Sequence, residues 1–193
     1  MADFTLTSEP PLAGTQTTRG SVRLSAPESL AIVSVALPLG QEKPACSAIE
    51  SAFKLVFPDP GQSTVAQDGT RLVRTGPDQA LLIFEWPTPD AESHVASKLK
   101  GKAYTTDQTD VWVALALEGP DCRAVLERIC PIDLDPTAFA ENDAARTMME
   151  HLGVLIVSTG KDSFLLLSAS SSARTFLHAL ETSMFNALGE GGA

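Results

Sequence analysis

The sequence has little of what marks several common classes of protein. Its 193 residues contain 14 Lys and Arg against 24 Asp and Glu, which gives a formal net charge of −10 and a pI near 4.6. Binding to nucleic acid rewards a basic surface, so we expect no nucleic-acid partner. Apolar runs such as ALLIFEW are only as long as a strand, so we expect no membrane partner either. The acidity remains compatible with docking onto a basic surface of another protein.

Cysteine is scarce, and the usual catalytic motifs are missing. Cys46, Cys122 and Cys130 are odd in number and lack metal-type spacing, which favours reduced thiols in a cytoplasmic protein. The N-terminal residues lack a basic region followed by an apolar stretch, so no secretory signal is expected. The sequence contains no P-loop, G-x-S-x-G, H-E-x-x-H or C-x-x-C motif, and no G-x-G-x-x-G between a strand and a helix.

What the sequence does contain is an internal repeat of a strand and a helix. The apolar, β-branched run at 30–38 predicts a buried strand, and Pro44 begins a helix whose apolar stripe extends to Val56. The run at 111–119 predicts a second strand, and Pro120 begins a second helix. Both helices open with the pattern Pro-x-Cys-x-Ala-Ile/Val, 76 residues apart, which indicates a duplicated unit.

Each predicted helix is followed by three extended segments, at 63–85 and at 146–168. The last two segments of each set are joined by similar turns, Thr-Gly-Pro-Asp from Thr75 and Thr-Gly-Lys-Asp from Thr159. Glycine permits the turn backbone, and aspartate can accept hydrogen bonds from local amides. A final helix follows each set: one over 88–100, begun by Thr88 and Asp90, and one over 171–187, begun by Ser170–Ser172. Each half therefore reads β-α-β-β-β-α.

These elements predict an α+β protein built from two similar halves, with largely antiparallel sheets and helices on one face. We expect an extended N-terminal arm at 1–20, a first half at 21–102, a second half at 103–188 and a flexible tail at 189–193. Each half is too small to bury much surface alone, so the two sheets should share a core or interface.

The histidines are candidates for acid–base or metal chemistry. His94 and His178 lie at equivalent positions of the two terminal helices, 84 residues apart, and His151 lies in a predicted turn. No H-x-x-x-H pattern or nearby cysteine accompanies them. We therefore favour structural histidines, with a functional pair as the alternative.

The cysteines and the paired carboxylates also have a structural interpretation. Cys46 and Cys122 lie early in the two predicted helices, where packing is favoured and a reactive thiol is the alternative. Asp107 and Asp110 precede a strand, and the Asp-Leu-Asp-Pro run at 133–136 has the composition of a turn. Either carboxylate pair could instead serve acid–base work or hold a metal. The sequence thus predicts no catalytic, cofactor-binding or metal-binding residue in this chain.

Residues 107–180 contain several short motifs in a definite order. They are the Asp-Gln-Thr-Asp lead-in at 107–110, Gly119-Pro120, the Cys-Pro-Ile-Asp-Leu segment at 130–134, Ala145-Arg146-Thr147 and the turn at Thr159-Gly160. In these motifs and their spacing, residues 107–180 resemble the gamma subunit of heterotetrameric sarcosine oxidase, and the first hundred residues match more loosely, in length, acidity and element order. That family is itself similar to the folate-binding half of the glycine-cleavage aminomethyltransferase, which implies a ferredoxin-like or folate-binding-domain type of fold.

The resemblance implies an assembly of alpha, beta, gamma and delta chains that oxidises sarcosine to glycine. Electrons pass from FAD to FMN and then to O2, and the one-carbon unit goes to tetrahydrofolate. In that family the alpha and beta chains hold NAD, FAD and FMN, the delta chain holds zinc, and the gamma chain holds no cofactor. The resemblance therefore implies a non-catalytic, structural role with alpha, beta and delta chains as partners.

Two alternatives remain open. One is a stand-alone folate-binding protein like the aminomethyltransferase, although the acidic position that contacts folate after the transferase's turn is apolar in both copies here. The other is the same subunit of a related oxidase or dehydrogenase acting on another N-methyl amino acid. For contacts with partner chains we expect Arg146 and the acidic loop 133–143, which carries the second half's extra residues.

Overall fold

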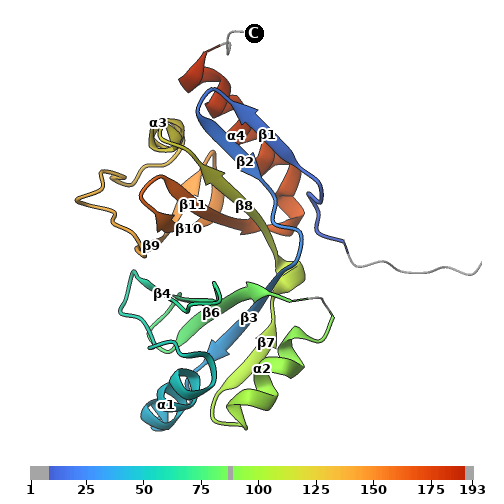
Figure 1. Cartoon of the computed structure of the whole chain (residues 1–193), viewed down its shortest axis with the longest axis vertical. Helices are drawn as coiled ribbons and strands as arrows, with labels where there is room; N and C mark the ends of the chain where they lie inside the picture. Colours follow the sequence, from blue (N-terminus) through green and yellow to red (C-terminus); the bar gives the residue numbers. More distant parts are fainter. Residues whose placement is uncertain (1–8, 87–88, 190–193) are drawn as a thin grey trace, which may run out of the picture.

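Two antiparallel sheets form the framework of the computed structural model, which describes residues 9–86 and 89–189 (Figure 1). The upper sheet has six strands in the order β1-β2-β8-β11-β10-β9, and the lower sheet has five in the order β4-β5-β6-β3-β7. Helices cover the outer face of each sheet, so the α+β prediction is confirmed. Within the described residues, no helix is both long enough and apolar enough to cross a membrane.

The upper sheet packs its outer face against two helices. The largest fully buried side chains in that core are Phe164 and Phe176. Ala173, Phe176 and Leu180 recur at helical spacing and turn one stripe of the last helix toward the sheet. The elements are β1 (Gln16–Arg19), β2 (Val22–Ser25), η1 (Thr109–Val111), β8 (Trp112–Glu118), α3 (Cys122–Glu127), β9 (Ala144–Met149), β10 (Leu152–Gly160), β11 (Ser163–Ala169), η2 (Ser170–Ser172) and α4 (Ala173–Leu188).

The lower sheet is covered in the same way by two helices from the first half. Its elements are β3 (Leu30–Ala36), α1 (Glu42–Phe53), β4 (Ser63–Val65), β5 (Arg71–Arg74), β6 (Gln79–Glu85), α2 (Ala91–Leu99) and β7 (Tyr104–Asp107). Helix α1 begins two residues before Pro44, so the prediction that Pro44 is the first helical residue is wrong. The helix also ends before Val56, because Lys54 takes a left-handed backbone conformation with φ 60°.

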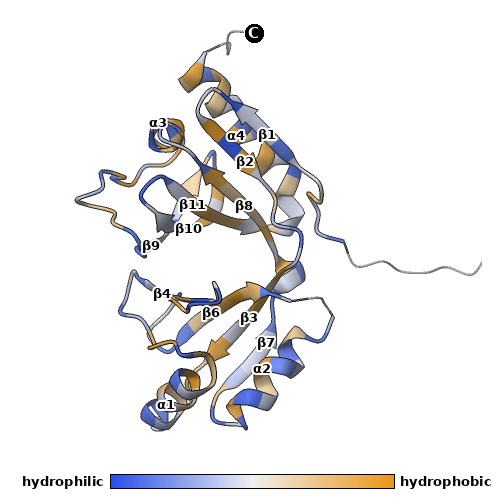
Figure 2. Cartoon of the chain, viewed as in Figure 1, coloured by the Kyte–Doolittle hydropathy of each residue, from blue (hydrophilic) through white to orange (hydrophobic). Residues whose placement is uncertain are grey.

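A third core joins the inner faces of the two sheets, as the sequence predicted. Strand β6 is therefore buried on both faces, which explains why residues 80–84, ALLIF, are continuously apolar rather than alternating. Figure 2 shows the hydrophobic residues gathered on the central strands. The buried residues of this third core are Ile32, Val73, Leu81 and Ile83 from the lower sheet and Ala144, Leu155, Val157 and Leu167 from the upper sheet.

One backbone hydrogen bond occurs at equivalent positions of the two halves, which supports the duplication. The amide of Leu37, just after β3, donates to the carbonyl oxygen of Asp78 at 2.8 Å. The amide of Gly119, just after β8, donates to the carbonyl oxygen of Asp162 at 2.9 Å. The two similar turns thus serve the same purpose, which is to hold the end of the first long strand of each half.

The sheets exchange strands across the predicted boundaries of the halves. Strand β2 lies within the predicted first half, 21–102, but pairs with β8 in the upper sheet, and β7 lies within the predicted second half but pairs with β3 in the lower sheet. Residues 16–19 were expected in an extended arm and instead form β1. Residues 1–8, Thr88 and 190–193 lie outside the described residues.

Candidate functional site

The three histidines are not brought together by the fold. The ring of His94 packs against Trp86 with centroids 4.0 Å apart and the ring planes tilted by 32°, and partial burial lowers the pKa of His94. His178 is exposed on α4 in the other half, and His151 lies in the β9–β10 turn with φ 70°. Among residues 9–86 and 89–189, no group of three His, Cys, Asp or Glu could hold a metal. These placements support the structural interpretation.

The cysteine thiols are held in their protonated form by burial. Desolvation raises the pKa of fully buried Cys122 to about 11, and it also raises the pKa of Cys130 and Cys46. A thiolate nucleophile needs the opposite shift. The position of Cys122 at the start of α3 therefore does not make it reactive.

We expect the thiols of the native protein to differ in reactivity toward Ellman's reagent. At pH 8 a thiol with a pKa near 11 is ionised in only about one molecule in a thousand. Half-buried Cys46 should react first, while Cys122 and Cys130 should react fully only in guanidinium chloride. Mass spectrometry of the alkylated peptides identifies each site. Rapid labelling of Cys122 in the folded protein would contradict the burial described above.

A carboxylate from each of the two pairs stabilises a turn. The Oδ1 atom of Asp107 accepts a hydrogen bond from the Thr109 amide at 2.9 Å, ahead of β8. In the 133–143 loop, Asp135 Oδ1 accepts from the amide and the hydroxyl of Thr137, and these bonds lower the pKa of Asp135. Aspartate in turns commonly accepts a hydrogen bond of this kind from the backbone amide two residues further along the chain. The absence of catalytic residues from the chain as a whole stays a prediction.

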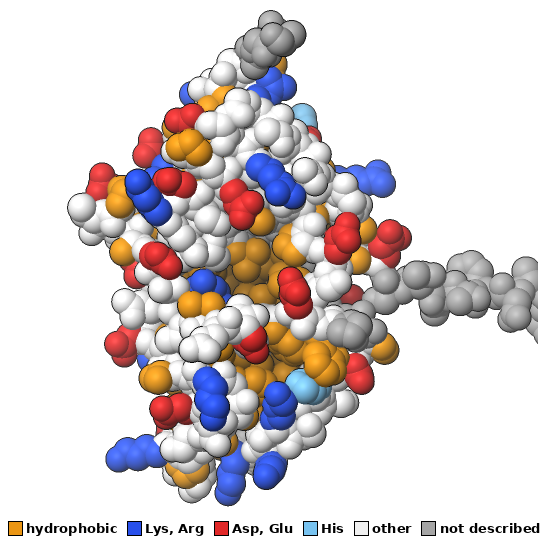
Figure 3. Space-filling view, viewed as in Figure 1, with side chains coloured by type: hydrophobic (Ala, Val, Ile, Leu, Met, Phe, Trp, Pro, Cys, Tyr) orange, Lys and Arg blue, Asp and Glu red, His pale blue; other side chains and the backbone are white. Residues whose placement is uncertain are grey.

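The main concave feature lies at one side of the core between the sheets. Two adjoining hollows of about 510 and 260 Å³ share Arg146 and Leu155, and we call them together the intersheet groove. Figure 3 shows hydrophobic side chains gathered in the hollow between the two sheets. The lining residues are Pro60, Gly61, Arg74, Thr75, Gly76, Pro77, Ala144, Ala145, Arg146 and Leu155 in the larger hollow, and Val111, Trp112, Arg146, Thr147, Gly153, Val154, Leu155 and Ala169 in the smaller one.

The two arginines of the groove differ in what they contact. Arg74 donates to the carbonyl oxygens of Pro58, Gly76 and Pro77 and lies over the ring of Phe57. It therefore stabilises the turn between β5 and β6. The side chain of Arg146, on strand β9, is exposed and is the other cation of the lining.

The groove does not fit a folate pterin ring. The amino-pyrimidinone edge of a pterin presents adjacent N–H donors, which a carboxylate satisfies best. The residues that line the intersheet groove include two arginines but neither aspartate nor glutamate. We derive no chemical step through folate for this chain.

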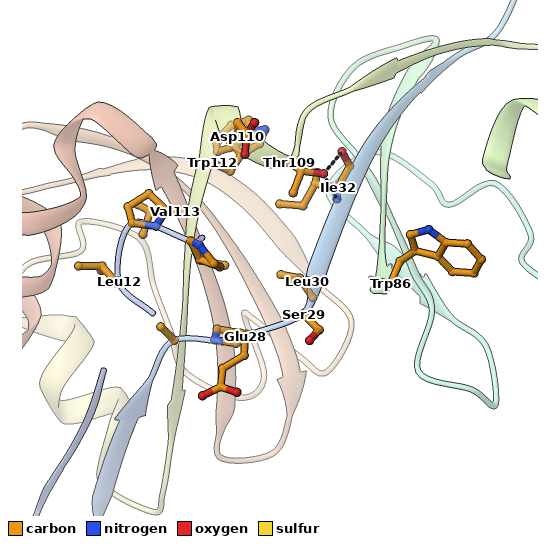
Figure 4. A pocket seen from close by; sticks show the side chains of 15 residues that line it. Leu12, Glu28, Ser29, Leu30, Ile32, Trp86, Thr109, Asp110, Trp112 and Val113 are labelled. Atoms are coloured by element: carbon orange, nitrogen blue, oxygen red, sulfur yellow. Dashed lines mark hydrogen bonds between the residues drawn. The ribbon is translucent and has the colours of Figure 1, made fainter. Parts of the chain in front are cut away.

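A smaller cavity of about 120 Å³ lies where the chain crosses twice between the sheets, at 26–30 and 107–112 (Figure 4). Thr109 joins the two crossings, since its Oγ1 accepts from the Ile32 amide at 3.2 Å. Trp86 and Trp112 both line the cavity, but Figure 4 shows them well apart. They do not form an aromatic cage of the kind that binds a cation.

The two regions expected to contact partners are placed differently. Arg146 is exposed in the intersheet groove, as an interface residue would need to be. The loop 133–143 is instead anchored, because Leu134 and Phe139 are buried in the upper core. The sequence analysis missed the groove itself: its floor is formed by Gly153, Leu155 and Ala169, which nothing in the sequence connects to the turn at Thr75.

Comparison with known proteins first defines the class of fold. No protein-family model matches the chain. Over 84% of this chain and 46% of its own, the glycine cleavage system aminomethyltransferase T of Bartonella henselae superimposes with a TM-score of 0.60 at 20% identity. The chain therefore has the fold of that transferase's corresponding half, as the sequence implied.

The resemblance to the gamma subunit of sarcosine oxidase is also confirmed. The chain is 32% identical over 117 residues to sarcosine oxidase subunit gamma of Corynebacterium sp. (strain P-1), and 33% identical over 107 residues to that of an Arthrobacter species. These alignments cover 61% and 55% of this chain, and only 58% and 53% of the relatives' own length. A chain of heterotetrameric sarcosine oxidase from Corynebacterium sp. U-96 matches with a TM-score of 0.77 at 25% identity, over 95% of this chain and 93% of its own.

Proposed function

We propose that this chain is the non-catalytic gamma subunit of a heterotetrameric sarcosine oxidase. The observation that carries the proposal is the match to a chain of that enzyme over 95% of the residues. The complex would oxidise sarcosine to glycine, reduce O2 to hydrogen peroxide and transfer the one-carbon unit to tetrahydrofolate. The gamma chain would contribute to assembly rather than to chemistry, in keeping with the structural roles found above for its histidines and for its buried, protonated thiols.

In this proposal the partners are the alpha, beta and delta chains in the cytoplasm. FAD, FMN, NAD, tetrahydrofolate and zinc would be held by those chains, and none by this one. Three free cysteines suit a reducing compartment. Another N-methyl amino acid could take the place of sarcosine without any change in this chain, since the substrate would be bound elsewhere.

Co-expression tests the proposal directly. We expect the chain to co-purify in equal amounts with the alpha, beta and delta chains of its source organism when alpha carries the affinity tag. Omitting this chain should lower the yield of assembled, sarcosine-oxidising complex. A chain that folds and remains a separate monomer in the presence of the other three contradicts the proposal.

Calorimetric titration of the isolated chain with tetrahydrofolate tests the stand-alone alternative. We expect no binding, because the groove lining lacks a carboxylate for the pterin edge. Tight binding at one equivalent would instead favour a folate-binding protein that acts alone.

A further inference from the structure

Strand β9 forms one edge of the upper sheet, and part of that edge is open. The amide of Ala144 donates away from the sheet, to the carbonyl oxygen of Gly61 at 2.7 Å, so the outer edge at this end is already paired. Backbone groups alternate in direction along an antiparallel strand. The amides and carbonyls of Arg146 and Met148 therefore also point outward, and within the described residues no backbone partner reaches them.

The inner face of the upper sheet is uncovered beside the same edge. Met148 pairs with Gly153 in the strand register, and Ala169 pairs with Trp112. Met148, Gly153 and Ala169 are all exposed, and a Cβ added to Gly153 would meet nothing within 4 Å. Gly153 and Ala169 line the smaller hollow, and Met148 continues the row at the strand edge. Val111, about half exposed, also lines this hollow. Proteins usually protect a strand edge of this kind with lysine, proline or a covering loop.

The charge at this edge identifies the kind of partner that fits. Arg146 is exposed and borders both hollows of the intersheet groove, while the other arginine of the lining is engaged with three carbonyl oxygens. Among the residues that line the groove, Arg146 is therefore the cation that no turn carbonyl engages. A carboxylate on the partner, placed opposite Arg146, would complement its charge. A strand added to β9 would lie about 4.8 Å from it and would place every second side chain over the groove.

We propose that the open edge of β9 receives an extended segment of a partner chain of the complex. The segment would carry a carboxylate opposite Arg146 and an apolar side chain over Gly153. It is short, because Gly61 and Gln62 already occupy the edge at Ala144 and Asp143. This inference rests on the proposed function, which supplies the partner chains.

Two variants of the exposed edge test the proposal in the co-expressed complex. Met148→Pro removes an outward amide without breaking a bond to β10, and Arg146→Glu reverses the charge. Each should weaken retention of this chain by tagged alpha about tenfold or more, measured by quantitative mass spectrometry across a dilution series. Arg174→Glu is the matched control: it makes the same charge change at an exposed site in the first turn of α4, and it should leave retention unchanged.

The possible outcomes separate the two proposals. If the unaltered chain is not retained by tagged alpha, the proposed function is contradicted and the inference falls with it. If the unaltered chain is retained and both edge variants are retained equally well, the inference alone is overturned. Sedimentation could instead show that the isolated chain is a dimer and that both edge variants are monomers. That result would also overturn the inference, because the edge of β9 would then bind a second copy of this chain. Thermal unfolding of each variant establishes whether it folds. If Met148→Pro does not fold, Arg146→Glu alone still tests the inference.

Discussion

Alanine in place of Gly119 is expected to lower the free energy of unfolding by about 3 kcal/mol or more. Gly119 has φ 127°, which side chains with a Cβ rarely adopt. The added Cβ would lie 1.9 Å from the carbonyl oxygen of Ser21, a backbone atom that cannot rotate away. Relief of this clash requires β2 to move from β8, and β2 carries the fully buried side chains of Val22 and Leu24.

Gly40→Ala supplies the matched control for this prediction. Gly40 also has a positive φ, 74°, but a Cβ there would meet nothing within 4 Å. It should therefore report the backbone cost alone, about 1 kcal/mol. Guanidinium unfolding followed by circular dichroism measures both variants. Equal destabilisation of the two would show that β2 does not approach Gly119 as closely as described.

Elements with strong local signals were predictable from the sequence. The β3 and β8 strands, helix α2 within the predicted range 88–100, and the Ser170–Ser172 lead into α4 were all predicted close to their observed places. Each is indicated by nearby residues: a β-branched run, a residue type common before helices, or an apolar stripe. The duplication was visible for the same reason, because it repeats these local signals in the same order.

The strands that exchange between the sheets were not predictable in the same way. Strand β1 reads Gln-Thr-Thr-Arg and β7 reads Tyr-Thr-Thr-Asp, and neither contains a buried side chain that would give a period of two. Each is a strand because a neighbouring strand offers it backbone partners. The pairings of β7 with β3 and of β2 with β8 are non-local, so the boundary between the halves could not be located from composition.

In the candidate site too, features that depend on local sequence were predictable and features that depend on non-local packing were not. The structural interpretation of the histidines and carboxylates followed from missing motifs, and the placements of His94 and Asp135 support it. The intersheet groove could not be found in the sequence, because it forms where the turn at Thr75 faces β9 and β10 across two sheets. Arg146 was singled out from the sequence, but its open strand edge becomes visible only in the register of β9.

Among the polar contacts between the two sheets, those made by Asn142 are expected to contribute most to the free energy of unfolding. Its backbone carbonyl accepts from the Ser63 amide at 2.7 Å, and its amide donates to Ser158 at 2.8 Å. Its Oδ1 accepts from Arg71 Nη1 at 2.8 Å, and the same nitrogen also donates to Ser63 Oγ at 2.7 Å. Arg71 is only 8% exposed, and burial lowers its pKa, so the cation depends on these acceptors.

Asn142→Ala should therefore cost about 2–4 kcal/mol of unfolding free energy, measured by chemical denaturation at pH 7. A hydrogen bond to a charged group contributes about 1.5–3 kcal/mol, and alanine adds the cost of the left-handed backbone at φ 72°. Asn142→Gly avoids the cost of the left-handed backbone but still removes the acceptor for Arg71. Its unfolding free energy should therefore lie between those of the alanine variant and the native chain.

Asn142→Asp provides the test of the charge itself. The introduced carboxylate keeps an acceptor and places a negative charge beside the buried Arg71, so the stability at pH 7 should equal or exceed that of the native chain. Arg71 should lower the carboxyl's pKa in the folded state below its value in the unfolded chain, near 4. The added stability is then present above that value and is lost as the pH falls through the folded pKa. If the aspartate and alanine variants unfold alike at pH 7, the buried cation does not depend on this acceptor, and the apolar core and the backbone hydrogen bonds hold the sheets together without it.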